Sequence, residues 1–353
     1  MDLRQLEISP DMLRIIAELD EFKGSWKVAQ NFTPERLTSL RQVATIESIW
    51  SSTRIEGARL SDQEVEALLQ GISSKSFTTR DEQEVAGYAQ VMDLVFENFR
   101  DITLSESYIR FLHKELLRHC EKDQYHHGQY KKFPNNVEAF DGAGESLGVV
   151  FETASPFDTP RQMEDLIHWT RESLEDRLLH PLIVIWVFVV VFLSIHPFQD
   201  GNGRLSRVLT TLLLLRAWYS YVPYASLESV IEKNKQAYYL ALRRTQGAMR
   251  ENRQDWFPWL RFFLGSLKRQ KDHLAVKIEQ HAPELCWEMP RENILILEYV
   301  WRHGRITTAQ AVELTAIPRP TVRLRLSQLV EAGLLEAKGK GRGSFYVKSV
   351  KSK

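Results

Sequence analysis

Apolar residues recur at helical spacing along most of the chain. Ile15, Ile16, Leu19 and Phe22 follow a three- to four-residue period, which predicts an amphipathic helix near the N-terminus. Proline is common in the first turn of a helix, so Pro34 indicates that the next helix starts there. Similar patterns predict helices over residues 46–57, 81–99, 105–117, 159–169, 230–244 and 256–267. The hydrophobic pattern therefore predicts a mainly α-helical protein.

Two apolar segments lack a polar face. Leu182–Ile195 and Val208–Leu215 are apolar almost throughout, so each predicts a helix buried on all sides. The first has 14 residues, whereas a membrane span needs roughly 20, so we expect a core helix. The polar residues 196–207 then form a short loop that leads from one buried helix into the next.

Residues 126–156 interrupt the helical pattern. Repeated glycine, proline and asparagine residues break any long helix in this region. Two short extended segments, Gly128–Lys131 and Leu147–Phe151, predict a β-hairpin over about residues 128–152, with an extra loop at about 135–145.

The pattern changes again near residue 285, where Pro283 and Pro290 indicate a linker. Beyond it, short apolar patterns predict three helices, beginning near residues 294, 307 and 318, and a glycine-rich hairpin over residues 334–347. This order resembles a winged helix-turn-helix domain. We therefore expect an N-terminal helical region at 1–100, a core domain at 101–270, a linker at 271–289 and a winged helix-turn-helix domain at 290–353.

Composition adds limits on function and compartment. The 353 residues are 43% hydrophobic, enough for a packed core, and the 46 basic residues balance the 46 acidic ones. The balance gives no global attraction to nucleic acid or to a membrane. The two cysteines have no metal-like spacing, and the N-terminal residues lack the basic and apolar regions of a signal peptide. We expect a cytoplasmic protein without a membrane partner.

The polar segment between the two buried helices has the features of a phosphate site. Gly201 and Gly203 flank Asn202 at the predicted start of the second helix, where unpaired backbone N–H groups and the helix dipole attract anions. Arg204 and Arg207 are three residues apart and can contact successive phosphates. The segment therefore predicts a polyphosphate ligand.

Two further residues in this segment supply chemistry. Asp200 offers a hard oxygen ligand suited to Mg²⁺, which usually joins a carboxylate to phosphates. His196 can accept a proton near neutral pH. Together these groups suit the attack of a hydroxyl on a nucleotide phosphate.

The segment His196-Pro-Phe-Gln-Asp-Gly-Asn-Gly-Arg-Leu-Ser-Arg207 resembles the signature of the Fic family, His-x-Phe-x-Asp/Glu-Gly-Asn-Gly-Arg-x-x-Arg, at every defined position. The resemblance implies a helical Fic core with a β-hairpin flap, and transfer of AMP from ATP to a hydroxyl side chain of a target protein or of the enzyme itself. Related kinases have lysine at the position of Gly203, so glycine here favours nucleotidyl transfer.

The same resemblance implies a role for each position. His196 would deprotonate the target hydroxyl, and Asp200 would hold Mg²⁺ on the nucleotide. The phosphate ligands would be Gly201, Asn202, Gly203, Arg204 and Arg207, with Arg207 on the γ-phosphate. The nucleotide-binding residues of the flap and of the adenine site would be Gly148, Val149, Val150, Phe151, Tyr238 and Gln246.

An upstream segment, Ser52-Thr-Arg-Ile-Glu56-Gly57, resembles the inhibitory helix motif of the same family, Ser/Thr-x-x-x-Glu-Gly/Asn. Ser52 and Glu56 are four residues apart and share one helix face. The resemblance implies that Glu56 pairs with Arg207 and takes the place of the γ-phosphate. Some family members also use this glutamate to orient water for AMP removal, so that activity stays open.

The C-terminal domain suggests a competing function. From Pro318 onward there are nine basic and two acidic residues, and Arg323 and Arg325 lie on the expected recognition helix. Both DNA binding and a protein contact, including homodimerisation, remain open for this domain. The alternative is a DNA-binding regulator whose core only senses nucleotide. His196 and Asp200 favour the enzyme, because sensing needs no base.

Overall fold

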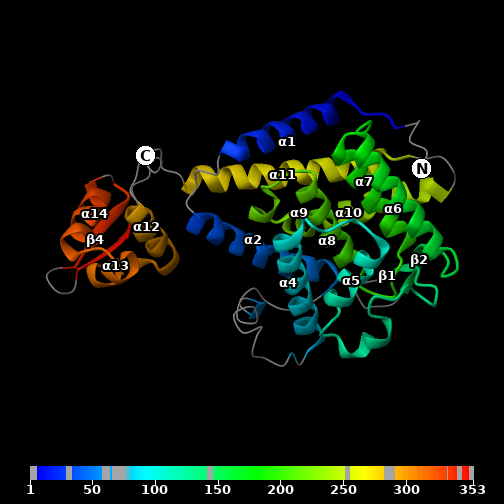
Figure 1. The fold of residues 1–353 in the computed structure, drawn as a ribbon, viewed down its shortest axis with the longest axis horizontal. Helices are drawn as coiled ribbons and strands as arrows, with labels where there is room; N and C mark the ends of the chain where they lie inside the picture. The colour runs from blue at the N-terminus through cyan, green and yellow to red at the C-terminus, as the bar shows by residue number, and fades with distance from the viewer. Residues whose placement is uncertain are drawn as a thin grey trace. The chain divides into compact units, whose positions relative to one another are not determined.

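Helices make up most of the part of the chain that the computed structural model describes (Figure 1). The described residues are 6–28, 34–57, 64–65, 77, 79–140, 146–250, 255–281, 291–331, 333–339 and 344–349. They divide into two compact units, with the boundary between Leu274 and Ala275, and each unit is described by itself. The boundary lies inside the segment 271–289 expected as a linker, although the first part of that segment is helical.

The first unit is built from helices and one hairpin. Its elements are α1 (Pro10–Val28), most of α2 (Pro34–Ile55), α4 (Arg80–Asn98), α5 (Glu106–Leu116), a 3-10 turn (Glu121–His126), β1 (Val137–Phe140), β2 (Ser146–Phe151), α6 (Thr159–Asp176), α7 (Pro181–Ile195), α8 (Asn202–Arg216), a 3-10 turn (Val222–Tyr224), α9 (Leu227–Lys233), α10 (Lys235–Arg250) and most of α11 (Phe257–His281). The predicted mainly α-helical class is confirmed.

The two apolar helices α7 and α8 form the centre of this unit. Almost every side chain of α7 from Leu182 onward is buried, and so are Asn202 and Arg204–Leu215 of α8. Helices α4 and α5 pack against α8, while α6 and α10 contact α7. The polar loop between α7 and α8 is therefore held among four other helices, which fixes its position.

Helices α4 and α5 approach each other closely at Gly87. A Cβ added at this residue would overlap the backbone carbonyl of Leu116 in α5. The start of α4 is fixed by a capping box, in which Thr79 and Glu82 bond each other's backbone N–H groups. Both features hold the first turns of α4 beside the loop.

Two sequence predictions were wrong in this unit. The single helix expected over residues 230–244 is divided at Asn234, whose side chain bonds the carbonyl of Val230 and ends α9. The hairpin pairs β2 with Val137–Phe140, which was expected as loop. The other expected strand, Gly128–Lys131, instead meets the α7–α8 loop, through a bridge between Tyr130 and Phe198.

In its described residues, the second unit has three complete helices and three strands, together with the end of α11. It contains α12 (Arg291–His303), β3 (Arg305–Thr307), α13 (Thr308–Thr315), α14 (Arg319–Glu331), β4 (Leu335–Lys338) and β5 (Phe345–Lys348). The strands form an antiparallel sheet in the order β3-β5-β4. Apolar residues of all three helices, such as Leu297, Ala311 and Leu326, share one core. The predicted winged helix-turn-helix fold is confirmed.

Among the described residues, no helix combines the length and apolar character that a membrane crossing requires.

Candidate functional site

The loop between α7 and α8 turns through two left-handed residues. Helix α7 ends at His196, whose φ is 52° and whose N–H still bonds the carbonyl of Phe192 at 2.9 Å. Gly201 has a φ of 76°, a conformation that glycine adopts without strain, and α8 begins at the next residue. His196 and the first residues of α8, Asn202 and Gly203, line the same cavity.

The side chain of Asn202 closes this loop. Its Oδ1 accepts the N–H of Phe198 at 2.9 Å, and its Nδ2 donates to the carbonyl of Phe198 at 2.7 Å. The phenyl ring of Phe198 is fully buried and stacks on the imidazole of His113, with 3.8 Å between ring centroids. The amide of Asn202 thus shapes the backbone of the α7–α8 loop, while its own polar atoms are already bonded.

His113 of α5 holds the other end of the loop. Its Nδ1 accepts the N–H of Gly128 at 3.0 Å, so the proton of the neutral ring lies on Nε2, which donates to the carbonyl of Asp200 at 3.0 Å. Burial lowers the pKa of His113 to about 4, which agrees with this neutral form. The buried histidine positions the loop.

His196 lies at the mouth of the same site. Burial, reinforced by the nearby positive charge of Lys131, lowers the pKa of His196 to about 4. The Lys131 ammonium is itself buried and donates to the carbonyl of Ile195 at 2.9 Å and to Thr153 at 2.8 Å. The imidazole of His196 is therefore uncharged near pH 7 and has a lone pair available.

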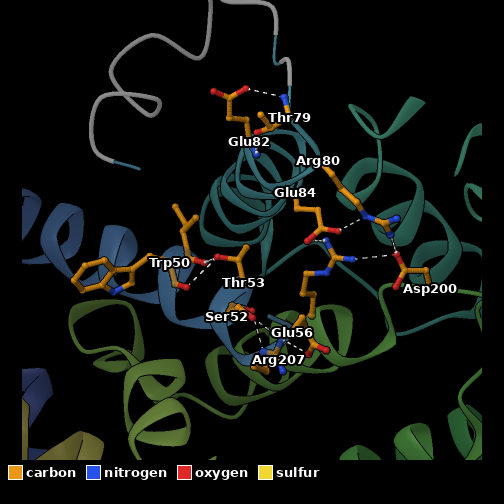
Figure 2. Close-up of polar contacts among 12 residues, drawn as sticks. Trp50, Ser52, Thr53, Glu56, Thr79, Arg80, Glu82, Glu84, Asp200 and Arg207 are labelled. Carbon is orange, nitrogen blue, oxygen red and sulfur yellow. Dashed lines mark hydrogen bonds and ion pairs between the residues drawn. The ribbon is translucent and has the colours of Figure 1, made fainter. Parts of the chain in front are cut away.

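Arg207 is almost fully buried and is held by α2. Its Nε donates to the hydroxyl of Ser52 at 2.9 Å, and its Nη2 donates to the carbonyl of Ser52 at 3.0 Å and to the carboxylate of Glu56 at 2.7 Å (Figure 2). The guanidinium also interacts with the hydroxyl of Tyr238. The structure thus brings Ser52, Glu56 and Arg207 together.

Arg204 and Asp200 belong to a second set of charges (Figure 2). Arg204, with only 2% of its side chain exposed, lies 3.0 Å from Glu84 and 3.3 Å from Asp200. Arg80, at the start of α4, lies 2.7 Å from Asp200 and 3.0 Å from Glu84. Arginine holds the pKa of Asp200 below its usual range despite burial, so its carboxylate is ionised.

A cavity of about 210 Å³ lies beside the start of α8 and is lined by Glu56, His196, Asp200 and Arg204 among others, but not by Arg207. It is lined by Glu56, Leu193, His196, Gln199, Asp200, Gly201, Asn202, Gly203, Arg204, Tyr238, Tyr239, Leu242, Arg243 and Gln246. The carboxylate of Glu56 lies directly over Gly203, where any added Cβ would overlap it. The cavity thus has a cationic and N–H-rich end and an aromatic end.

The flap residues are less fully described. Gly148, Val149, Val150 and Phe151 lie in β2, which contacts α10, the helix that carries Tyr238 and Gln246. Their side chains lie outside the described part of the structure. The backbone of β2 nonetheless lies beside α10, which also supplies residues to the cavity.

Sequence reasoning missed three charged residues of the site, Arg80, Glu84 and Lys131. The i, i+4 spacing of Arg80 and Glu84 is visible in the sequence, but such pairs are common on exposed helices. Nothing local indicates that these residues face Asp200, which is 120 positions from Arg80.

Asp200 fits a Mg²⁺ site of the kind that uses substrate phosphates. The described residues contain no group of three or more metal-binding side chains. Mg²⁺ in nucleotide sites is commonly held by one or two carboxylates together with phosphates and water. The ionised Asp200, at the cationic end of the cavity, suits such a single protein contact.

Comparison with known proteins identifies two segments. Residues 103–214 match a family model described as the Fic/DOC family, and residues 293–336 match one described as winged helix-turn-helix DNA-binding. Similar curated proteins include the protein adenylyltransferase Fic of Drosophila grimshawi, 25% identical over 67% of this chain and 44% of that protein. A probable protein adenylyltransferase of Aquifex aeolicus is 28% identical over 28% of each chain. The chain thus spans less than half the length of these relatives.

Solved structures show the same fold. A Fic family protein from Desulfovibrio desulfuricans matches 98% of both chains, with a TM-score of 0.65 and 24% identity. A Fic domain containing signaling protein from Bacteroides thetaiotaomicron matches 74% of this chain and 97% of its own, with a TM-score of 0.60 and 24% identity. Residues 103–214 are therefore a domain of the Fic/DOC family, joined to a C-terminal winged helix-turn-helix domain.

Proposed function

We propose that this protein is a protein adenylyltransferase, which transfers AMP from ATP to a hydroxyl side chain of a target protein or of itself. The observation that carries the proposal is the shared cavity of His196, the start of α8 and Arg204. Relatives of the Fic domain named protein adenylyltransferase support the same reaction class.

The reaction needs a base and an anion site. The neutral His196 accepts the proton of the target hydroxyl while the oxygen bonds to the α-phosphorus and the bond to the diphosphate breaks. A bound triphosphate adds negative charge beside the imidazole, which raises the pKa of His196 and makes it a stronger base. The N–H groups of Gly201, Asn202 and Gly203 and the guanidinium of Arg204 stabilise charge that develops on the phosphates.

ATP binds with its phosphates at the start of α8 and its adenine at the aromatic end, beside Tyr238 and Gln246. Mg²⁺, held through Asp200, would neutralise phosphate charge when bound. The buried guanidinium of Arg207, which Glu56 pairs with at 2.7 Å, supports an anion at this position, because a buried cation needs a compensating charge.

Glu56 makes this enzyme autoinhibited. Its carboxylate bonds Arg207 at 2.7 Å and covers Gly203. An anion cannot share that position with a second anion, so the γ-phosphate must displace Glu56 before Arg207 can bind it. The flap, in turn, presents an extended backbone to which a target segment adds as a strand.

Mass spectrometry of the full chain after incubation with ATP and Mg²⁺ tests the proposal. We expect a mass increase of one AMP on the protein, larger in Glu56→Gly and absent in His196→Ala. Parallel reactions with UTP, GTP and CTP identify the preferred nucleotide. No incorporation from any nucleoside triphosphate, even by Glu56→Gly, would reject the enzyme.

The winged helix-turn-helix domain supports a second function, DNA binding. The family description of residues 293–336 names it, and Arg319 and Arg323 of α14 are exposed. With nine basic residues against two from Pro318 onward, the surface suits a phosphate backbone. Binding to duplex DNA that weakens as salt rises supports this function, and no retention at low salt rejects it.

A further inference from the structure

Four alternating charges form a closed ring beside the α8 start. The guanidinium of Arg80 bonds Asp200 at 2.7 Å and Glu84 at 3.0 Å, and Glu84 and Asp200 both lie within 3.3 Å of Arg204. Each arginine thus joins the same two carboxylates (Figure 2). One of these carboxylates, Asp200, is the residue to which the proposed function assigns the cation.

The two arginines of the ring differ in their freedom to move. Arg204 has 2% of its side chain exposed and Glu84 has 10%, so both are held in the interior. Arg80 has 54% exposed and Asp200 has 40%. Arg80 is therefore the arginine of the ring that has access to water, while Arg204 and Glu84 pair with each other in the interior.

The helix that carries Arg80 is fixed in place. The capping box of Thr79 and Glu82 sets the first turn of α4, and the close contact of Gly87 with α5 holds the following turns. The guanidinium is thus presented to Asp200 by a rigid element rather than by a loop.

We propose that Arg80 competes with the divalent cation for the carboxylate of Asp200, an inference that rests on the proposed function. In the state seen here, the guanidinium of Arg80 bonds Oδ2 of Asp200, which also lies 3.3 Å from Arg204, and its charge would repel a divalent cation held by the same carboxylate. Movement of Arg80 away from Asp200 toward solvent would therefore favour cation binding. Arg80 thereby sets how strongly nucleotide binding depends on the metal, a control separate from the contact between Glu56 and Arg207.

Calorimetric titration with ADP tests this role without catalysis. ADP lacks the γ-phosphate, so it does not require Glu56 to move. The dissociation constant of ADP is measured in Mg²⁺ and in EDTA, and the ratio of the EDTA value to the Mg²⁺ value reports the metal dependence. The variants are the full-length wild type, Arg80→Gln and the control Arg161→Gln, which removes the same charge from another exposed arginine that pairs with two aspartates.

We expect Arg80→Gln to raise the ratio roughly two- to fivefold, the factor that corresponds to losing one partly exposed ion pair. Arg161→Gln should leave the ratio at the wild-type value. If Arg80 only bound phosphate, its replacement would weaken ADP binding both in Mg²⁺ and in EDTA. If its role were purely structural, both dissociation constants would change by the same factor. Either result, or a lower ratio, overturns the inference while leaving the proposed function intact. If no variant binds ADP with or without Mg²⁺, both are overturned.

Discussion

The contact between Glu56 and Arg207 predicts a selective change in nucleotide affinity. In the proposed enzyme, ATP must replace the carboxylate of Glu56 with its γ-phosphate, whereas ADP does not reach this position. Replacement of Glu56 by glycine removes the competing anion and leaves Arg207 its two bonds to Ser52. The variant should therefore bind ATP more tightly and ADP about as well as before.

The size of the effect follows from the bond that ATP no longer has to break. A hydrogen bond between charged groups contributes about 1.5–3 kcal/mol, or about 10- to 150-fold in affinity at 1.36 kcal/mol per decade. The side chain of Glu56 is 33% exposed, while that of Arg207 is 4% exposed. Solvent screening on the Glu56 side places the expected gain near the lower end, at about tenfold.

Calorimetry in a His196→Ala background measures this gain without turnover. Titrations with ATP and with ADP compare Glu56, Glu56→Gln and Glu56→Gly, and Gln should give an intermediate gain because it keeps the shape but loses the charge. Glu97→Gln, an exposed carboxylate of α4, is the charge control. Equal gains for ATP and ADP would show that Glu56 acts on the whole site, and no gain for either would refute the autoinhibitory contact.

Four further predictions concern the same elements and the second domain. Because the pKa of His196 is lowered to about 4 in the nucleotide-free protein, its imidazole stays neutral there as pH falls through 6.5. The labelling rate of Glu56→Gly at ATP well below saturation, which reports the free enzyme, should therefore remain level to about pH 5.5; a decline centred at pH 6.5 would contradict the lowered pKa. Asn202→Ala removes both bonds to Phe198 and should cost about 1–3 kcal/mol in urea unfolding, against a smaller loss for the exposed control Asn98→Ala. Gly203→Ala should destabilise the wild type, where its Cβ meets Glu56, yet be neutral or stabilising by up to about 1 kcal/mol in Glu56→Gly; the same change in both backgrounds would argue against that contact. In the winged helix-turn-helix domain, Arg323→Ala should weaken duplex DNA binding and reduce its logarithmic salt slope by about one, and an unchanged slope would place DNA elsewhere.

The loop between α7 and α8 could be predicted from the sequence because its charged and polar residues are close together in the chain. His196, Asp200 and Arg207 lie within twelve consecutive residues between two apolar segments, so the order of residues alone brings them together. The buried helices that carry the loop, α7 and α8, were equally plain, because a segment without a polar face has to be surrounded by other elements.

The hairpin was harder because strand pairing depends on distant partners. Val137–Phe140 is short and stands among asparagine and glycine residues, which by themselves favour a loop. The segment Gly128–Lys131 is not a strand of the hairpin: Gly128 is left-handed, with a φ of 66°, and only Tyr130 forms a bridge, with Phe198 of the α7–α8 loop. The N–H of Lys131 also bonds the carbonyl of Pro197 in that loop, at 2.8 Å. The contact that this segment makes was therefore not predictable from its own residues.

The acidic residues that pair with the arginines of the loop follow a rule that can be applied to a sequence. A guanidinium buried as deeply as Arg204 or Arg207 requires a compensating anion whenever no phosphate is bound. The inhibitory motif supplies one such anion, Glu56, to Arg207. The same requirement applied to Arg204 demands a second carboxylate, and the structure supplies Glu84 from α4. Two buried signature arginines thus predict two acidic partners from elsewhere in the chain. Only the identity of the second partner, and the attachment of Arg80 to it, needs the three-dimensional fold.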